Sequence, residues 1–187
     1  MNSVKTLVKE HENIMRMLEV IHQASLGILQ GDEIDTDDFK QIIGFVCNYA
    51  DRSHHGKEEE FFFRAMLDEL GPIAEKLIRN GMLAEHDLGR LYVSDLAGAI
   101  KSYESNPTEE SRLAVLVASG SYEQLLRRHI EKENDVVFTF GEKNLSEQSA
   151  RWVEDGVRKF EEDPGNRAER EHQLTVLTDL EKKYLSF

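Results

Sequence analysis

One pattern of histidines and acidic residues occurs twice in the sequence, at an offset of 75 residues. HHGKEEEFFF at 54–63 aligns without gaps onto HIEKENDVVF at 129–138, and both read His, three residues, Glu, one residue, an acid, two residues, Phe. The same offset carries His11, in EHE, onto His86, in EHD. Four of the seven histidines therefore form two pairs with a gap of 43 residues, which indicates a tandem duplication of a helical hairpin.

Apolar residues recur along the chain at helical spacing rather than in alternation, which predicts helices. The acidic run GDEIDTDD and the breaks at Gly71-Pro72 and SNPTEES separate four long helices, and EDPGN divides the charged tail into two shorter ones. The four long helices are expected at about 1–30, 37–70, 72–103 and 109–140, the third of them interrupted at Asn80-Gly81. The predicted fold is all-α, an antiparallel up-down four-helix bundle (1–140) built from two tandem helical hairpins. An additional C-terminal helical segment (141–187) is predicted to pack on the bundle.

Turn positions bring the repeated residues to one level of this bundle. In an antiparallel helix pair, two residues meet at the same height when the turn lies halfway between them. The midpoints coincide with turn signals at Gly31-Asp32, Pro72 and Pro107. The level collects six residues: His11, His54, Glu58, His86, His129 and Glu133. Each His-x3-Glu places both side chains on one otherwise apolar helix face, so they are expected to point inward.

Four imidazoles and two carboxylates turned into a helical core are costly to bury unless they bind a cation. The absence of cysteine from the set argues against a structural zinc site. Six nitrogen and oxygen ligands suit two ions, with both glutamates bridging, and favour iron or manganese over calcium or magnesium. In this prediction, His11 and His54 hold one ion and His86 and His129 the other.

These motifs, together with LAEHDLGR at 83–90, resemble the hemerythrin-like family, also called the His-His-Glu cation-binding domain, over about 1–140. The resemblance implies a four-helix bundle around two iron ions in an oxo- or hydroxo-bridged non-haem di-iron centre, with manganese as an alternative metal. Members of the family carry oxygen, sense oxygen or redox state, handle nitric oxide or peroxide, or regulate iron.

The sequence departs from the oxygen carriers of that family at two places. Arg90 stands four residues after His86, where the carriers typically have a second histidine, and His129-x3-Glu133 replaces their usual His-x4-Asp. One lost imidazole would leave its ion more open. This favours sensing, or slow oxidative chemistry, over reversible oxygen carriage.

The leading hypothesis is therefore a di-iron protein that binds or senses a small ligand (dioxygen, nitric oxide or peroxide) or redox or iron state, and no catalytic residue is predicted. One alternative is a di-iron oxidoreductase that acts on peroxide, nitric oxide or ferrous iron. The other is a metal-free helical interaction module. Whether the protein is an enzyme stays open, with a sensor favoured.

The net charge of −13 argues against nucleic acid or an anionic membrane surface as a partner, and the sequence identifies no protein partner. A cytoplasmic location is expected because the chain shows no signal segment or membrane span and has one cysteine. We expect Cys47 to be a small buried hydrophobe.

Three further expectations concern the neighbours of the repeated residues. His55 aligns with Ile130 and is expected to be exposed or to lie beside the ligands. Glu59 and Glu60 are expected to form a solvated helix face. The phenylalanines at 61–63 are expected to pack in the core and against the tail.

Overall fold

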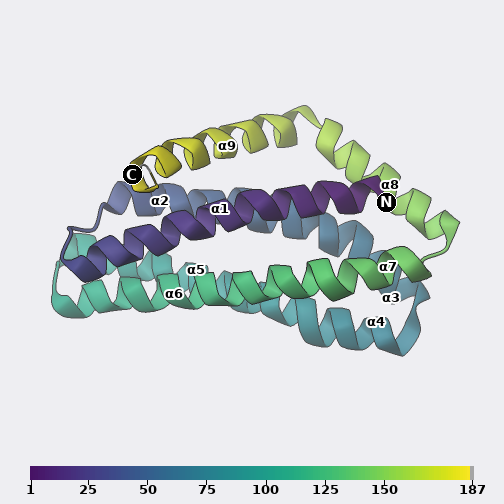
Figure 1. Ribbon diagram of the computed structural model, residues 1–187, viewed down its shortest axis with the longest axis horizontal. Helices are drawn as coiled ribbons and strands as arrows, with labels where there is room; N and C mark the ends of the chain where they lie inside the picture. The colour runs from purple at the N-terminus through teal and green to yellow at the C-terminus, as the bar shows by residue number, and fades with distance from the viewer. Residues whose placement is uncertain (186–187) are drawn as a thin grey trace.

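The computed structural model describes residues 1–185, and these residues form six long helices without a strand among them (Figure 1). The first is α1 (Asn2–Gln30), and the second runs through α2 (Thr36–Phe45), η1 (Val46–His55), η2 (Glu58–Phe63) and α3 (Arg64–Glu69). The third comprises α4 (Gly71–Leu77), η3 (Ile78–Met82) and α5 (Leu83–Ser105). The fourth comprises α6 (Glu109–Lys132), η4 (Glu133–Val137) and α7 (Phe138–Asn144), and α8 (Glu147–Glu162) and α9 (Pro164–Tyr184) follow. The all-α prediction is confirmed.

Local signals in the sequence account for the helix ends. Gly31 adopts a left-handed conformation with φ of 108° and ends α1, which a residue without Cβ does at little cost. Asp35 accepts a hydrogen bond from the backbone N–H of Asp38 and begins α2. Thr108 and Ser111 form a reciprocal cap at the start of α6. The predicted interruption at Asn80-Gly81 is wrong, because the chain stays helical there through the π-helical segment η3.

The four long helices pack side by side, and the level of the repeated histidines separates two apolar regions of the core. One region, toward the Gly31 end, includes Leu18, Phe45 and Leu96. The other, toward α3 and α4, includes Phe62 and Met66. Because apolar packing holds both ends of the bundle, the polar level between them is fixed in position.

The two C-terminal helices lie along one side of the bundle, with α9 beside α1 and α2 (Figure 1). Val153 and Val157 of α8 are buried with Phe62 and Phe63 of the second helix. The ring of Phe61 lies 5.9 Å from that of Trp152 in α8, so the predicted core and tail contacts of 61–63 are confirmed. The division into a bundle, 1–140, and an extension, 141–187, remains our proposal.

The docking of α8 depends on a close approach at Gly156. A Cβ at this position would lie 2.4 Å from the ring of Phe61, whereas a Cβ at Gly98 in α5 would meet no atom within 4 Å. Gly156→Ala should therefore lower the free energy of unfolding by about 1–3 kcal/mol through overpacking. Gly98→Ala, the matched control, should raise it by about 0.5–1 kcal/mol because alanine favours the helix. Urea denaturation measures both, and equal stability of the two variants would contradict the packing described.

Candidate metal centre

The structure brings together all six residues that the repeat singled out. His11 comes from α1, His54 and Glu58 from the second helix, His86 from α5, and His129 and Glu133 from the fourth helix. Their exposed fractions lie between 0 and 2%. The predicted residues thus form one buried cluster, whereas their role as ligands stays a prediction.

Each glutamate of the cluster begins a short π-helical segment. Glu58 begins η2 and Glu133 begins η4, at the same offset of 75 residues that relates the sequences. The wider turn changes the direction in which the following side chains project, and such segments frequently occur at functional sites. The duplication therefore preserves backbone geometry as well as residue type.

The two carboxylates lie between the two pairs of histidines. Glu58 Oε1 is 3.4 Å from His54 Nε2, and Oε2 is 3.7 Å from His86 Nε2. Glu133 Oε2 is 3.2 Å from both His11 Nε2 and His129 Nε2, and its Oε1 is 3.8 Å from His86 Nε2. Each carboxylate thus faces imidazoles of both pairs, as a bridging ligand would.

Most of these inward-facing atoms lack a hydrogen-bond partner within residues 1–185. Both oxygens of Glu58, both of Glu133 and the Nε2 atoms of His11 and His54 are buried without one. An unsatisfied buried polar atom costs about 1–3 kcal/mol, and more when it is charged. A cation that binds between them would satisfy these atoms together, so the residues present fit a metal ion.

The outward-facing Nδ1 atoms of the histidines, in contrast, all have acceptors. Four contacts position the rings: His11 with Asn134 (2.9 Å), His54 with Glu10 (3.0 Å), His86 with Glu59 (2.7 Å) and His129 with Glu85 (3.0 Å). Because a carboxylate or amide oxygen accepts, each Nδ1 carries a proton, and Nε2 is the atom that would offer a lone pair to an entering cation. This arrangement is typical of metal-ligating histidines.

The outer partners obey the repeat as well. Glu10 and Glu85 are 75 residues apart, as are Glu59 and Asn134. Phe63 lies against His86, with 5.8 Å between ring centroids, and its counterpart Phe138 lies 5.5 Å from His11. The cluster therefore consists of two half-sites, one with His11 and His54 and the other with His86 and His129. They share the pattern of histidine pairs, outer acceptors and flanking aromatic rings.

Comparison with known protein families gives one match, to the hemerythrin HHE cation-binding domain, over residues 2–140. The chain belongs to this family. Membership implies that the domain binds a cation, and the donor set of the cluster fits this role. Comparisons with curated proteins and with solved structures gave no match. Within residues 1–185, no helix of the HHE protein is long and apolar enough to cross a membrane.

The half-sites of this HHE domain differ in their exposure to solvent. Lys57 is fully buried and contacts Glu10. It also donates to Glu161 of α8 at 2.6 Å. Its counterpart Lys132 contacts Glu85, and its side chain is 46% exposed. Helix α8 therefore covers the half-site that contains His54, and the other half-site lies closer to solvent.

Two expectations about the neighbours are wrong, and one is confirmed in the second of its two forms. His55 is not exposed but lies beside the predicted ligand His86: 5% of its surface is exposed, and its ring stacks on His86 with centroids 3.8 Å apart. Glu59 is half-buried and holds His86 rather than forming part of a solvated face. Cys47 is exposed rather than buried, and it lines a cavity. Alignment of Glu59 with Asn134, a second hydrogen-bonding residue, was a signal that could have revealed its role.

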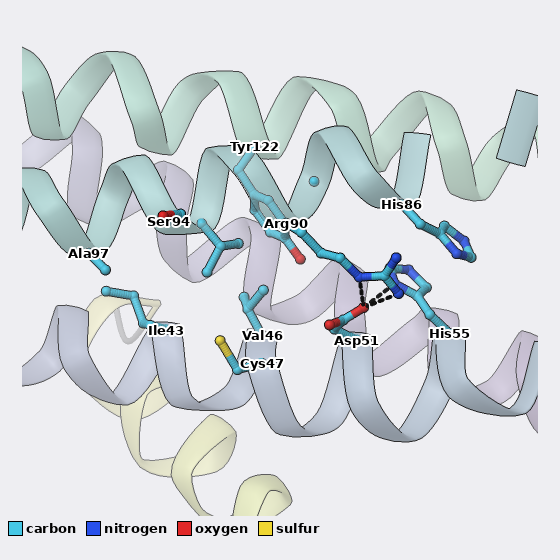
Figure 2. Close-up of a pocket in the computed structure, with 12 residues that line it drawn as sticks. Ile43, Val46, Cys47, Asp51, His55, His86, Arg90, Ser94, Ala97 and Tyr122 are labelled. Atoms are coloured by element: carbon cyan, nitrogen blue, oxygen red, sulfur yellow. Dashed lines mark hydrogen bonds and ion pairs between the residues drawn. The ribbon is translucent and has the colours of Figure 1, made fainter. Parts of the chain in front are cut away.

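A cavity of about 280 Å³ lies between the second helix and α5 and extends to His55 and His86 (Figure 2). Its wall is mainly apolar and includes Val46, Val93 and Tyr122. Arg90 reaches across it from α5 and donates to Asp51 at 2.9 Å (Figure 2). The cavity gives a small molecule a route toward the half-site that contains His86.

Burial and charge set the protonation of the cluster before a cation binds. Burial lowers the pKa of His54 well below its usual range, and the neighbouring His11 adds to this effect. Burial also raises the pKa of Glu58 well above its usual range, as does the charge of Glu133. Burial opposes the charge on His129, but Glu133 and Glu85 raise its pKa to about 9. A cation that enters must therefore displace protons.

The duplicated outer acceptors can be tested with a set of matched variants. Glu10→Gln and Glu85→Gln should each weaken the binding of Mn²⁺ by about 10–100-fold, because each holds the Nδ1 proton of one histidine. Glu12→Gln removes the same charge from an exposed position of α1 and should leave the affinity unchanged. Titration calorimetry measures all three. If the three variants bind Mn²⁺ equally well, the outer acceptors do not position the ligands.

Proposed function

We propose that the chain holds two iron ions between Glu58 and Glu133 and uses them to bind or sense a small ligand, such as dioxygen, nitric oxide or peroxide. The observation that carries this proposal is the pair of buried carboxylates, all four of whose oxygens lack a hydrogen-bond partner among the described residues. A single cation would leave one pair of histidines without a role. Two cations would engage both pairs and both carboxylates.

The donor set supports iron over other cations. Imidazole and carboxylate ligands in a set of six suit iron or manganese, whereas calcium and magnesium prefer oxygen alone. A structural zinc site would need only four ligands and would leave buried donors unused. In the proposed arrangement, His11 and His54 hold one iron and His86 and His129 the other, and the pair of irons supplies redox chemistry and open positions for a small ligand.

The protein's own residues keep the site rigid and dry. Glu10, Glu59, Glu85 and Asn134 hold the histidine rings by their Nδ1 protons. Phe63 and Phe138 cover the rings on the side toward α3 and exclude water there. A small ligand would approach from the cavity or from the more exposed half-site. The positions of the donors therefore do not depend on the ligand.

The lining of the cavity favours binding over turnover. Reduction of peroxide needs a proton donor near neutral pH, but burial raises the pKa of Tyr122 far above that range. Burial lowers the pKa of His55 to about 3, so its ring is neutral. Burial opposes the charge on Asp51, but hydrogen bonds from His55 and Arg90 lower its pKa to about 2. None of these side chains of the cavity supplies a proton readily.

Metal content tests the proposal directly. Protein loaded with ferrous iron and then oxidised in air should retain two irons per chain and show ligand-to-ferric charge-transfer absorption that changes with azide. His54→Ala should lose at least one iron, because it removes one of only two imidazoles from its ion. The control His172→Ala, at an exposed position of α9, should retain both. Retention of fewer than two irons by the unaltered protein would contradict the proposal.

An oxidoreductase with the same pair of irons is the alternative, since the cavity extends to His86. Steady-state assays with peroxide and with nitric oxide separate the two functions. A sensor should give a spectral change on ligand binding with fewer than a few turnovers per site. Sustained turnover that disappears in His54→Ala would establish the enzyme instead.

A further inference from the structure

The two half-sites also differ on the face between the second helix and α5. Three polar side chains there align with apolar residues 75 positions away: His55 with Ile130, Asp51 with Leu126, and Arg90 with Met15. Ile130 and Leu126 are buried in the apolar core, so plain packing fills these positions in the other half. The repeat itself therefore does not require an imidazole at position 55.

These three polar residues form one connected network (Figure 2). Asp51 Oδ1 lies 3.3 Å from His55 Nδ1 and accepts from Arg90 Nε at 2.9 Å. Arg90 also donates to Glu59 at 2.8 Å, and Glu59 holds His86. The carboxylate of Asp51 thus fixes the proton of His55 on Nδ1 and leaves Nε2 with a lone pair, as in the four histidines of the cluster.

The position of His55 places its ring beside one pair of histidines only. Its ring stacks on His86 with an angle of 13° between the planes, and its centroid lies 5.7 Å from that of His129. One ring nitrogen from each of these three histidines lies within 4.8 Å of the others. His11, His54, Glu58 and Glu133 form a second group by the same measure. The imidazole of His55 therefore belongs with the pair His86 and His129.

We propose that His55 is a third imidazole ligand of the cation that His86 and His129 hold, an inference that rests on the proposed paired-iron site. Arg90 cannot serve as a ligand, because its guanidinium is a cation without a lone pair to offer. It acts instead as an outer partner that holds Asp51 and Glu59. The missing imidazole of the third helix is thus supplied by the second.

The assignment makes the two ions unequal. With both glutamates shared, the ion at His86 has five protein ligands, whereas the ion at His11 and His54 has four. The ion at His11 would therefore offer more open positions to a small exogenous ligand. The cavity beside His55 then serves as a route into the site rather than as the seat of the ligand.

The matched variants His55→Gly and Ile130→Gly test this inference. Both place glycine at equivalent helix positions, and both remove a buried side chain. His55→Gly should weaken the binding of the second ferrous ion by at least ~10-fold. Loss of a residue that only positions a ligand already weakens metal binding by about 10–100-fold, and loss of a ligand should cost no less. Ile130→Gly should lower the stability of the fold but leave two irons bound. Anaerobic iron titration with folding monitored by circular dichroism separates the two effects.

Rescue of iron binding by free imidazole provides a second test, because no such rescue is expected if His55 serves only in packing. The cavity of about 280 Å³ opens onto His55, and one of ~150 Å³ already admits benzene, which is larger than imidazole. Imidazole should restore the second iron to His55→Gly at concentrations that leave the spectrum of the unaltered protein unchanged. Pulsed EPR of the one-electron-reduced protein should then differ between ¹⁴N- and ¹⁵N-labelled imidazole.

The outcomes separate this inference from the function on which it rests. Fewer than two irons in the unaltered protein would overturn the proposed function. Two irons in both the unaltered protein and His55→Gly, with equal affinity, would overturn only the role of His55. The role of His55 would also be overturned if His55→Gly and Ile130→Gly lost equal amounts of iron. An EPR spectrum of the imidazole-treated His55→Gly protein that is identical for ¹⁴N- and ¹⁵N-labelled imidazole would overturn it too.

Discussion

Two carboxylates buried among apolar helices are the constraint on which the rest of the structure depends. Glu58 and Glu133 are fully buried, and none of their oxygens has a hydrogen-bond partner among the described residues. Such groups destabilise a core unless something positively charged lies between them. The packing on either side of this level, from Leu18 to Phe62, holds the two groups in place. The architecture of the bundle is therefore that expected of a protein that encloses a cation-binding site.

Duplication of a hairpin explains how a chain of this size builds such a site. One hairpin supplies two histidines and one glutamate, and a second copy supplies the same set from the opposite direction. The copies also share the outer acceptors and the π-helical turn at each glutamate. A pair of equivalent half-sites is what a pair of cations requires. Differences between the copies, at His55 and at Lys57, would then make the two proposed ion sites unequal.

Much of the fold and of the site could be predicted from the sequence, and the predictions that failed did so for identifiable reasons. Helix ends at Gly31 and Thr108 were predictable because glycine and capping residues act locally. The six clustered residues were predictable because repeat and turn positions constrain each other. The continuous helix at Asn80-Gly81 was not, since the π-helical segment η3 depends on packing. The sequence left two positions open for His55, exposed or beside the ligands, because comparison with Ile130 identifies shared residues and says nothing of unique ones.

The central claim is that this level of the bundle holds two metal ions. Anomalous diffraction at the iron edge from crystals of the iron-loaded protein tests the claim most directly. The account predicts two peaks per chain, about 3.5–4 Å apart, that both Glu58 and Glu133 contact. A single peak, no peak, or carboxylates turned away from the metal would contradict it.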